Sequence, residues 1–158
     1  MHDRSNVSPT PEIFDLSHFV AEQEWAYPGV VEELRAGRKT SHWIWFIFPQ
    51  IAGLGRSAMS QRFSIRSLDE ARAYLAHPIL GRRLRECAQI LVATQGPNAD
   101  QIFGSLDAMK VRSSMTLFLR AAPDEALFQQ VLDQYYDGVP DPLTDALLGS
   151  AQPNLESA

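Results

Sequence analysis

The stretch from His42 to Gly55 constrains the fold more than any other part of the chain. Six large apolar residues, 43–48, run into Pro49, and a glycine-punctuated turn follows. Burying one large apolar side chain contributes roughly 1.5–3 kcal/mol, so the four aromatic residues in this run predict the centre of the core. Periodicity cannot separate a strand from a helix here, because every position is apolar. No second strand-like segment is present to pair with the run, so we expect one or two helical turns that end before Pro49.

Start and stop signals predict helices in the rest of the chain. Ser67 and Glu70 form a capping box, Gly37 is placed to end a helix, and Tyr27-Pro28 is expected to interrupt one. We predict an all-α fold with a single compact domain of about seven helices over residues 13–149, and flexible termini at 1–12 and 150–158. Besides the aromatic run, the expected helices cover residues 14–23, 28–37, 68–76, 78–95, 106–120, 125–136 and a last short segment within 141–149.

Composition excludes several classes of protein. The net charge of −5 opposes non-specific binding of nucleic acid, which makes a nucleic-acid partner unlikely, and the longest apolar run is far shorter than the ~20 residues that cross a bilayer. The single cysteine, Cys87, has no internal disulfide partner, and the first thirty residues carry charges where a secretory signal would be apolar. We therefore expect a cytoplasmic protein without a membrane span. No metal-ligand spacing is present, so neither a metal nor a cofactor is expected. The oligomeric state cannot be read from the sequence.

The segment 106–120 carries a polar strip between two apolar faces. One face holds residues 108, 111, 115, 118 and 119, and the other holds Leu106, Met109 and Leu117, so we expect packing on both sides. Asp107, Lys110 and Ser114 share the strip between them. Two interpretations are open: an Asp–Lys ion pair on a solvated edge, or one wall of a ligand cleft.

Two histidines are candidates for function. Neighbouring aromatic rings are expected to desolvate His42 and to keep its imidazole neutral for hydrogen bonding. The alternative is a histidine that caps a helix or is satisfied within the core. His77 precedes a proline, and its side chain is expected to close the preceding helix.

Other candidates lie in and after the aromatic run. Trp43 and Trp45 point to different sides of a helix, so at most one of them can stack on a ligand. Gln50 is a polar side chain beside the most apolar stretch and needs a partner or water. Backbone amides near Gly53 and Gly55 could bind an anion, although no strand precedes them and no Walker lysine follows.

Three segments, taken in order along the chain, carry a family resemblance. They are Lys39-x-x-His42-Trp43-x-Trp45-Phe46-Ile47-Phe48-Pro49-Gln50 with Gly53-Leu54-Gly55 after it, Glu70-Ala71-x-x-Tyr74-Leu75-x-His77-Pro78-x-Leu80-Gly81-x-Arg83-Leu84, and Ile102-Phe103-Gly104-x-x-Asp107-x-x-Lys110-Val111-Arg112-Ser113-Ser114-Met115-Thr116-Leu117-Phe118. On these segments the chain resembles a family of small bacterial proteins known as domain of unknown function family 1810. The resemblance covers roughly residues 14–148, implies an all-helical single domain and supplies no established activity. The family has been labelled calpastatin-like in places, but the chain lacks the repeats and the disorder-prone composition of that inhibitor, so we reject the role.

Helix packing does not explain the polar residues within these motifs, which a helical domain could gather around the aromatic run. One hypothesis is therefore a binding module or enzyme for a small anionic, nucleotide-like metabolite; a likeness in layout to a helical family that processes ADP-ribose motivates the nucleotide. The alternative is a non-enzymatic structural or interaction domain whose polar residues satisfy buried backbone groups.

In the first hypothesis, Trp45 or Trp43 stacks on a ring, and His42 or Asp107 is the general base. Lys110, Arg83 and the turn at residues 53–55 would hold phosphate. The polar residues that match the motifs are Lys39, His42, Gln50, His77, Arg83, Asp107, Lys110, Ser113, Ser114 and Thr116.

Overall fold

Helices form the regular secondary structure of residues 14–151, the part of the chain that a computed structural model describes. The predicted all-α class is confirmed. Nine helices are present in this range where about seven were expected, and two of the shortest follow the aromatic run and Gly96. They are α1 (Ser17–Arg35), α2 (Ile44–Ile47), α3 (Ala58–Arg62), α4 (Leu68–Ala76), α5 (Leu80–Ala93), α6 (Ala99–Phe103), α7 (Ser105–Ala121), α8 (Ala126–Tyr135) and α9 (Pro142–Ala151).

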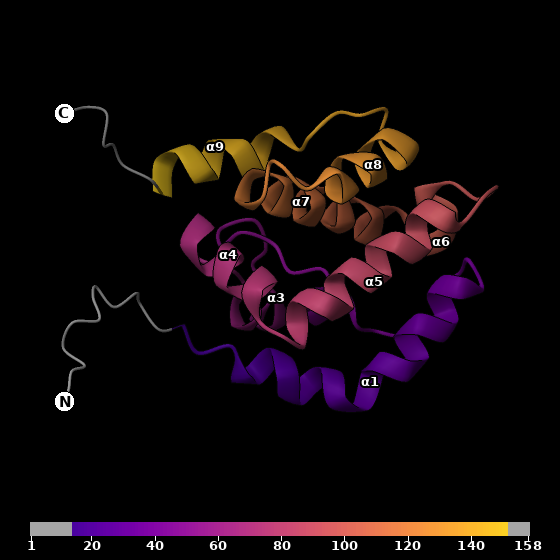
Figure 1. The fold of residues 1–158 in the computed structure, drawn as a ribbon, viewed down its shortest axis with the longest axis horizontal. Coiled ribbons are helices and arrows are strands. Elements are labelled where there is room, and N and C mark those ends of the chain that lie inside the picture. Colours follow the sequence, from indigo (N-terminus) through magenta and orange to yellow (C-terminus); the bar gives the residue numbers. More distant parts are fainter. Residues whose placement is uncertain (1–13, 152–158) are drawn as a thin grey trace.

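Helix α1 corrects the prediction of an interruption at Tyr27-Pro28. It is continuous from Ser17 to Arg35 and contains Pro28. A proline inside a helix removes one backbone hydrogen bond and favours a kink, and Figure 1 shows α1 changing direction near its middle. Phe19 before the proline and Leu34 after it are both completely buried. Burial of both halves against the same core outweighs the local cost of the proline.

The aromatic run forms the centre of the core, as predicted. The single-turn helix α2 ends at Phe48, next to Pro49, and Trp43 and Phe48 are at most 2% exposed. Beyond the proline, Ile51 forms an isolated parallel bridge with Ile65. The amide of Ile65 donates to the Gln50 carbonyl at 2.8 Å, which fixes the chain on both sides of α3.

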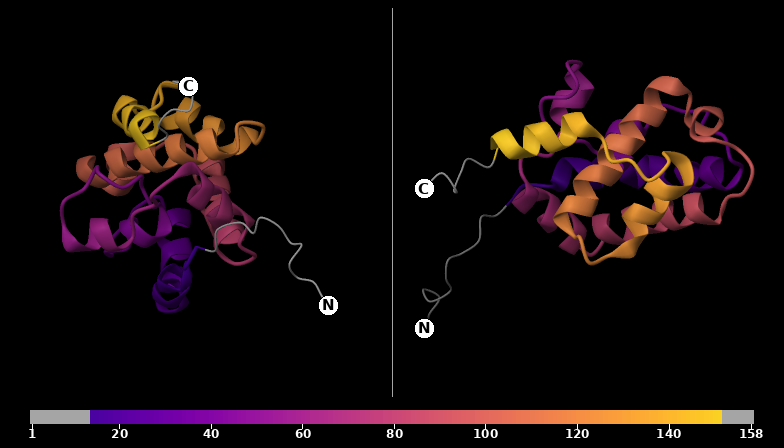
Figure 2. Two further views of the ribbon diagram at one scale, coloured as in Figure 1. Left: turned by 90° about the vertical axis from the view of Figure 1, so that its left-hand side faces the viewer. Right: turned by 90° about the horizontal axis from the view of Figure 1, so that it is seen from above.

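Helix α7 connects the two sides of the molecule. It packs against α2, α4, α6, α8 and α9, whereas α1 packs mainly against α2 and α5. Figure 1 shows α7, α8 and α9 along one side, α1 along the opposite side, and α4 and α5 between them. The views in Figure 2 show that the segment after α2 lies on the same side as α9. A β-carbon added at Gly53 would lie 3.2 Å from the Leu147 side chain, so this segment packs on α9.

The prediction that α7 packs on a second apolar face is wrong. Leu106 and Met109 are 73% and 64% exposed, and only Leu117 of that group is buried. The reason is tertiary: in the described part of the chain, no helix packs over Leu106 and Met109, which lie at the mouth of a cleft. At the carboxyl end, α9 runs through Gly149 to Ala151, past the expected end. The predicted flexible termini otherwise lie outside the described residues.

No helix within residues 14–151 combines the length and the apolar character needed to cross a membrane.

Candidate functional site

A cleft of about 230 Å³ opens between α7, the start of α9 and the turn that follows the aromatic run. We call it the α7–α9 cleft. It brings together four of the predicted site residues, Gln50, Gly55, Lys110 and Ser113, from two segments that lie more than fifty residues apart in the sequence. Its lining residues are Gln50, Leu54, Gly55, Leu106, Met109, Lys110, Arg112, Ser113, Asp141 and Leu143.

Asp141 anchors the start of α9 to α7. Its buried carboxylate accepts hydrogen bonds from the hydroxyls of Ser113 at 2.8 Å and Thr144 at 2.6 Å. The amides of Leu143 and Thr144 donate to the same carboxylate, at 3.3 and 3.2 Å. The Asp141 amide in turn donates to the Thr116 hydroxyl at 2.8 Å. A carboxylate with four donors at a helix start is a stable N-cap, so this wall of the cleft is rigid.

Arg112 holds the chain that leads into α9. Its Nε and Nη2 donate to the carbonyl oxygens of Val139 and Pro140 at 2.9 and 3.0 Å. Carbonyl groups are neutral, and no carboxylate of the described residues forms an ion pair with this guanidinium. Arg112 therefore contributes to the cleft lining a positive charge that is in no ion pair with a described carboxylate.

Two lysines share the carboxylate of Asp107. Lys39 Nζ lies 2.8 Å from Oδ2, with its side chain only 8% exposed, whereas Lys110 Nζ lies 3.4 Å from Oδ1. Each ammonium group also lies over an indole ring, Lys39 at 5.2 Å from the Trp43 centroid and Lys110 at 5.5 Å from that of Trp45. The closer, more buried pair with Lys39 neutralises Asp107 more completely. Lys110 is the cation that remains available at the edge of the cleft.

The polar strip on α7 contains the expected ion pair, and one member of that pair lies at the cleft. The i,i+3 ion pair between Asp107 and Lys110 is present, and Lys110 also lines the cleft. Ser114 lies elsewhere: it is fully buried, and its hydroxyl has no hydrogen-bond partner in the described part of the chain.

Glu33 fixes the orientation of Trp43, the ring on which Lys39 lies. Its carboxylate accepts from the amides of Thr40 and Ser41, from the Ser41 hydroxyl and from the indole Nε1 of Trp43 at 2.9 Å. Burial alone would raise the pKa of Glu33, but these hydrogen bonds outweigh it and lower the pKa to about 2. The carboxylate is thus charged throughout the physiological pH range and orients Trp43 under Lys39.

The rim of the α7–α9 cleft is apolar and open to solvent. Leu106, Met109 and Leu143 are 73%, 64% and 63% exposed, and they are three of the five most exposed large apolar residues in the described chain. Leu54 lines the same cleft and is half-buried. Apolar side chains gathered at the mouth of a cleft with a few polar groups are typical of a ligand site.

Several predicted site residues lie outside the cleft. His42 is exposed and does not line it, so the expected desolvation by neighbouring rings is absent. Trp45 is half-buried beneath Lys110, and Trp43 is core. Gly53 packs on α9 next to the cleft without lining it.

The two candidates from the α4–α5 region have local partners. His77 Nδ1 accepts from the amides of Ile79 and Leu80 at 3.1 and 3.2 Å, so it caps the start of α5 as well as following α4. The Arg83 guanidinium lies 4.7 Å from the Tyr27 ring centroid and pairs with Glu24 at 3.5 Å, facing α1. Arg83 therefore cannot hold the same ligand as Lys110.

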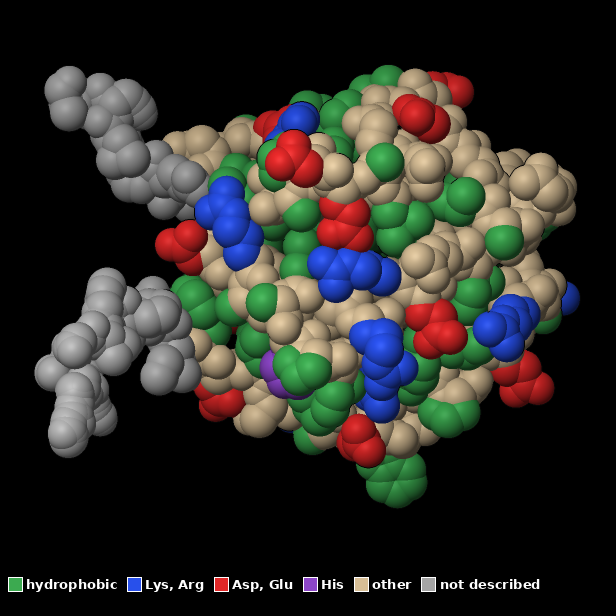
Figure 3. Space-filling view, in the orientation of Figure 1, with side chains coloured by type: hydrophobic (Ala, Val, Ile, Leu, Met, Phe, Trp, Pro, Cys, Tyr) green, Lys and Arg blue, Asp and Glu red, His purple; other side chains and the backbone are tan. Residues whose placement is uncertain are grey.

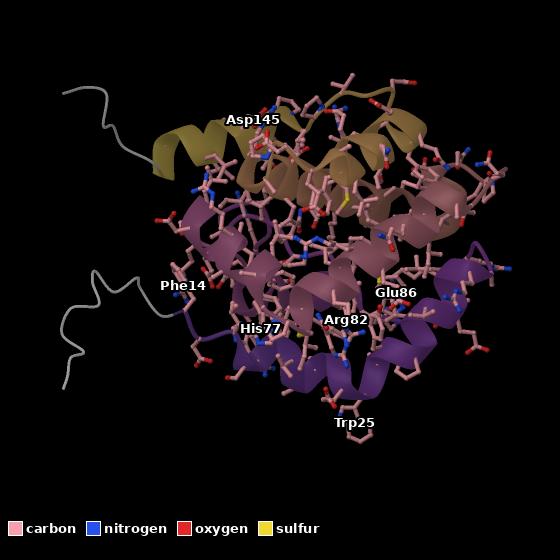
Figure 4. All side chains as sticks on the ribbon, viewed as in Figure 1. Phe14, Trp25, His77, Arg82, Glu86 and Asp145 are labelled. Carbon is pink, nitrogen blue, oxygen red and sulfur yellow. The ribbon has the colours of Figure 1, made fainter. Side chains whose placement is uncertain are left out.

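A second, shallower groove of about 570 Å³ lies at the junction of α4 and α5. His77, Arg82 and Glu86 line it, and Figure 4 labels all three on one face. Figure 3 shows basic and acidic side chains interspersed over that face. Arg85, also in the groove, is neutralised by Glu125 at 2.7 Å. The groove therefore has no excess of one charge.

Sequence reasoning missed Arg112, Asp141 and the apolar rim as parts of a site. Asp141 directly precedes Pro142 at the start of the last expected helix, and Arg112 belongs to one of the family motifs, but nothing local connects the two residues. Leu106 and Met109 were assigned to a packed face. Their exposure could only be seen once the neighbours of α7 were placed.

Neither of the two predicted general bases lines the cleft. Asp107 is held by two lysines, and His42 lies away from the cleft. Among the described residues, no group of three or more His, Cys, Asp or Glu side chains is placed to hold a metal ion.

Comparisons with known proteins agree with the sequence resemblance. A family model described as "Protein of unknown function (DUF1810)" matches residues 13–148. The chain is similar to the crystal structure of the conserved hypothetical protein Rv1873 from Mycobacterium tuberculosis, with 51% sequence identity and a TM-score of 0.84. That match covers 85% of this chain and 96% of the other. A comparison with curated proteins finds no match.

Proposed function

The chain belongs to the DUF1810 family of proteins of unknown function, and from its cleft we propose that it binds a small anionic metabolite. The ligand has an apolar or flat body that lies against the rim residues Leu106, Met109 and Leu143. Its anionic group faces Lys110, with Arg112 adding to the positive potential. Nucleotide-like compounds belong to the set of ligands to be tested.

One observation carries this proposal: polar candidates and exposed apolar side chains meet at the same cleft. Gln50 and Lys110 belong to separate motifs. Both line the cleft together with the exposed side chains of Leu106, Met109 and Leu143. Large exposed apolar side chains lower solubility, so their concentration around a polar recess favours a binding role. We propose binding without chemistry, because the two general-base candidates are not directed into the cleft.

A ligand screen tests the proposal. We expect nucleotides, ADP-ribose or small organic carboxylates to include at least one compound that raises the melting temperature of the wild type. Saturation at about 100 times Kd stabilises by about 2.7 kcal/mol, which corresponds to roughly 5–10 °C for a chain of this size. The shift should be lost in Lys110→Ala, since this change removes the available cation.

The matched control is Arg82→Ala, which removes one exposed cation from α5, outside the cleft. This variant should keep the full ligand-dependent shift. An equal shift in Lys110→Ala and wild type, or no shift with any compound, would exclude the proposed site.

The second candidate function is a non-enzymatic structural or interaction domain. It is favoured by the backbone partners of several motif residues: His77 caps α5, Arg112 binds two carbonyl groups and Thr116 bonds the Arg112 carbonyl at 2.9 Å. Trp25, 82% exposed on α1, projects away from the body in Figure 4 and adds a surface for such a role. If no compound in the ligand screen raises the melting temperature, the structural or interaction role becomes the favoured function.

A cytoplasmic location remains part of the proposal. Cys87 is a buried free thiol, and burial raises its pKa to about 12, which suits a reducing compartment where the thiol needs no partner.

A further inference from the structure

We infer that the ligand class of the α7–α9 cleft is a small monocarboxylate with an apolar body, and that nucleotides and other phosphate compounds are disfavoured. The inference rests on the proposed function, because it concerns the same cleft. Three features carry it: the size of the cleft, the balance of its charges and the state of the backbone amides at the start of α9.

The cleft is too small to enclose a whole nucleotide. Its volume is about 230 Å³, below the 300–1,000 Å³ of sites that enclose drug-sized ligands. One ring or one branched chain with a single polar group fits inside, whereas a base, a ribose and a phosphate together would extend beyond the rim.

The charges at the cleft match one negative charge better than two. Lys39, Lys110 and Arg112 are opposed by the carboxylates of Asp107 and Asp141, which leaves a single net positive charge. The Asp141 carboxylate is itself part of the lining, so a phosphate dianion would meet like charge there. A monoanion neutralises the excess and meets about half of this repulsion.

The backbone donors that commonly bind phosphate are already occupied. Helix N-termini bind anions through free amides in the first turn. At α9, however, the amides of Leu143 and Thr144 donate to the Asp141 carboxylate at 3.3 and 3.2 Å. The protein's own carboxylate therefore occupies the anion position of this helix, and the charged donors of the lining are the side chains of Lys110 and Arg112.

Lys110 can turn to a ligand without leaving a carboxylate unpaired. Its contact with Asp107 is 3.4 Å, while Lys39 holds the same carboxylate at 2.8 Å. The ligand carboxylate accepts from Lys110 beside Gln50, and the apolar body covers Leu54, Met109 and Leu143. Covering these side chains removes apolar surface from water, which supplies the second part of the affinity.

Isothermal titration calorimetry with four matched probes tests this assignment on the full chain: phenylacetate, the neutral phenylacetamide, phenyl phosphate and AMP. We expect phenylacetate to bind, with phenylacetamide and phenyl phosphate each at least about tenfold weaker and AMP weaker still, because charge-assisted pairing and size both select the monoanion. Lys110→Met should weaken phenylacetate by at least about tenfold, whereas Arg82→Met should leave its affinity unchanged.

Met109→Glu provides a second variant that does not depend on a buried change, since this side chain is 64% exposed. Both probes should lose the apolar contact with Met109, but only phenylacetate meets the added negative charge, so phenylacetate should be weakened more than phenylacetamide. A variant with an unaltered melting temperature excludes misfolding as the cause.

The failures of the two proposals are distinguishable. Lys110-dependent binding of AMP or phenyl phosphate at least as tight as that of phenylacetate would overturn the monocarboxylate class and retain the cleft as a ligand site. Equal binding of phenylacetamide and phenylacetate would overturn the role of the carboxylate. Absence of binding by all four probes at millimolar concentration would overturn the inference, while the broader screen with Lys110→Ala separately decides the proposed function.

Discussion

At the residue scale, Glu33 shows how one side chain organises the entry to the aromatic segment. It lies near the end of α1 and bonds three residues of the turn that precedes α2: Thr40, Ser41 and Trp43. Nothing in the local pattern around Glu33 indicates this role, because its partners are seven to ten positions away. The residue was absent from the sequence-based candidates for that reason.

Glu33→Gln should lower the free energy of unfolding by roughly 1–3 kcal/mol at neutral pH, the usual contribution of hydrogen bonds to a charged group. The pKa of Glu33 lies at about 2 in the folded protein, below the ordinary 4.5. Its contribution is therefore complete above about pH 4.5 and is lost as the pH falls towards 2. Urea unfolding at several pH values measures this. A difference between the two proteins that stays constant down to pH 2 would contradict the assignment.

At the element scale, the junction of α4 and α5 depends on one glycine. Gly81 lies in the first turn of α5 with ordinary helical geometry, and a β-carbon there would lie 2.0 Å from the Leu75 carbonyl oxygen. The requirement is therefore close approach of two helices, not a left-handed backbone. The sequence predicted both helices from their capping and periodicity, but the distance between them is set by packing.

Gly81→Ala should destabilise the protein by about 1–3 kcal/mol, the usual cost of overpacking, since the obstructing atom belongs to the backbone. Gly29→Ala is the matched control: it lies inside α1, and no atom lies within 4 Å of its added β-carbon. This change should stabilise the protein by about 0.5–1 kcal/mol through helix propensity. Chemical denaturation of both variants gives the comparison, and changes of the same sign would show that contact at Gly81 does not matter.

At the scale of the whole molecule, the Asp141 network decides how α9 is attached. The carboxylate joins α7, through Ser113, to the first turn of α9, through Thr144. This contact spans 28 positions in the sequence and forms one wall of the α7–α9 cleft. The integrity of the candidate site therefore depends on a contact between two helices that are far apart in the sequence.

Asp141→Ala should lower the free energy of unfolding by about 2–4 kcal/mol, because it leaves buried hydroxyl and amide donors without an acceptor. Asp145→Ala is the control on the same helix: it pairs with Arg120 at 2.8 Å, but both side chains are 40% exposed. Such surface pairs contribute about 0–1 kcal/mol. Hydrogen exchange should show α9 amides opening faster in Asp141→Ala only. Equal protection in both variants would contradict the anchoring role.

The sequence by itself determined the helical class, the position of most helices and the central place of residues 43–48. These properties follow from interactions within four residues along the chain and from the burial of large apolar side chains. Ser67, for example, caps α4 through the Glu70 amide at 3.0 Å, as its spacing predicts. Leu84 and Cys87, three positions apart on α5, are both buried, as helical periodicity requires of one apolar face.

Only the tertiary structure decided which elements continue and which side chains meet. Packing of both halves keeps α1 continuous through Pro28, and the open side of α7 leaves Met109 exposed. Lys110 was a candidate from sequence, but its availability depends on Lys39 holding Asp107 from a distant segment. Contacts of this kind depend on where whole helices pack, and no local pattern encodes that. The candidate site is therefore a product of packing around an aromatic core that the sequence already specified.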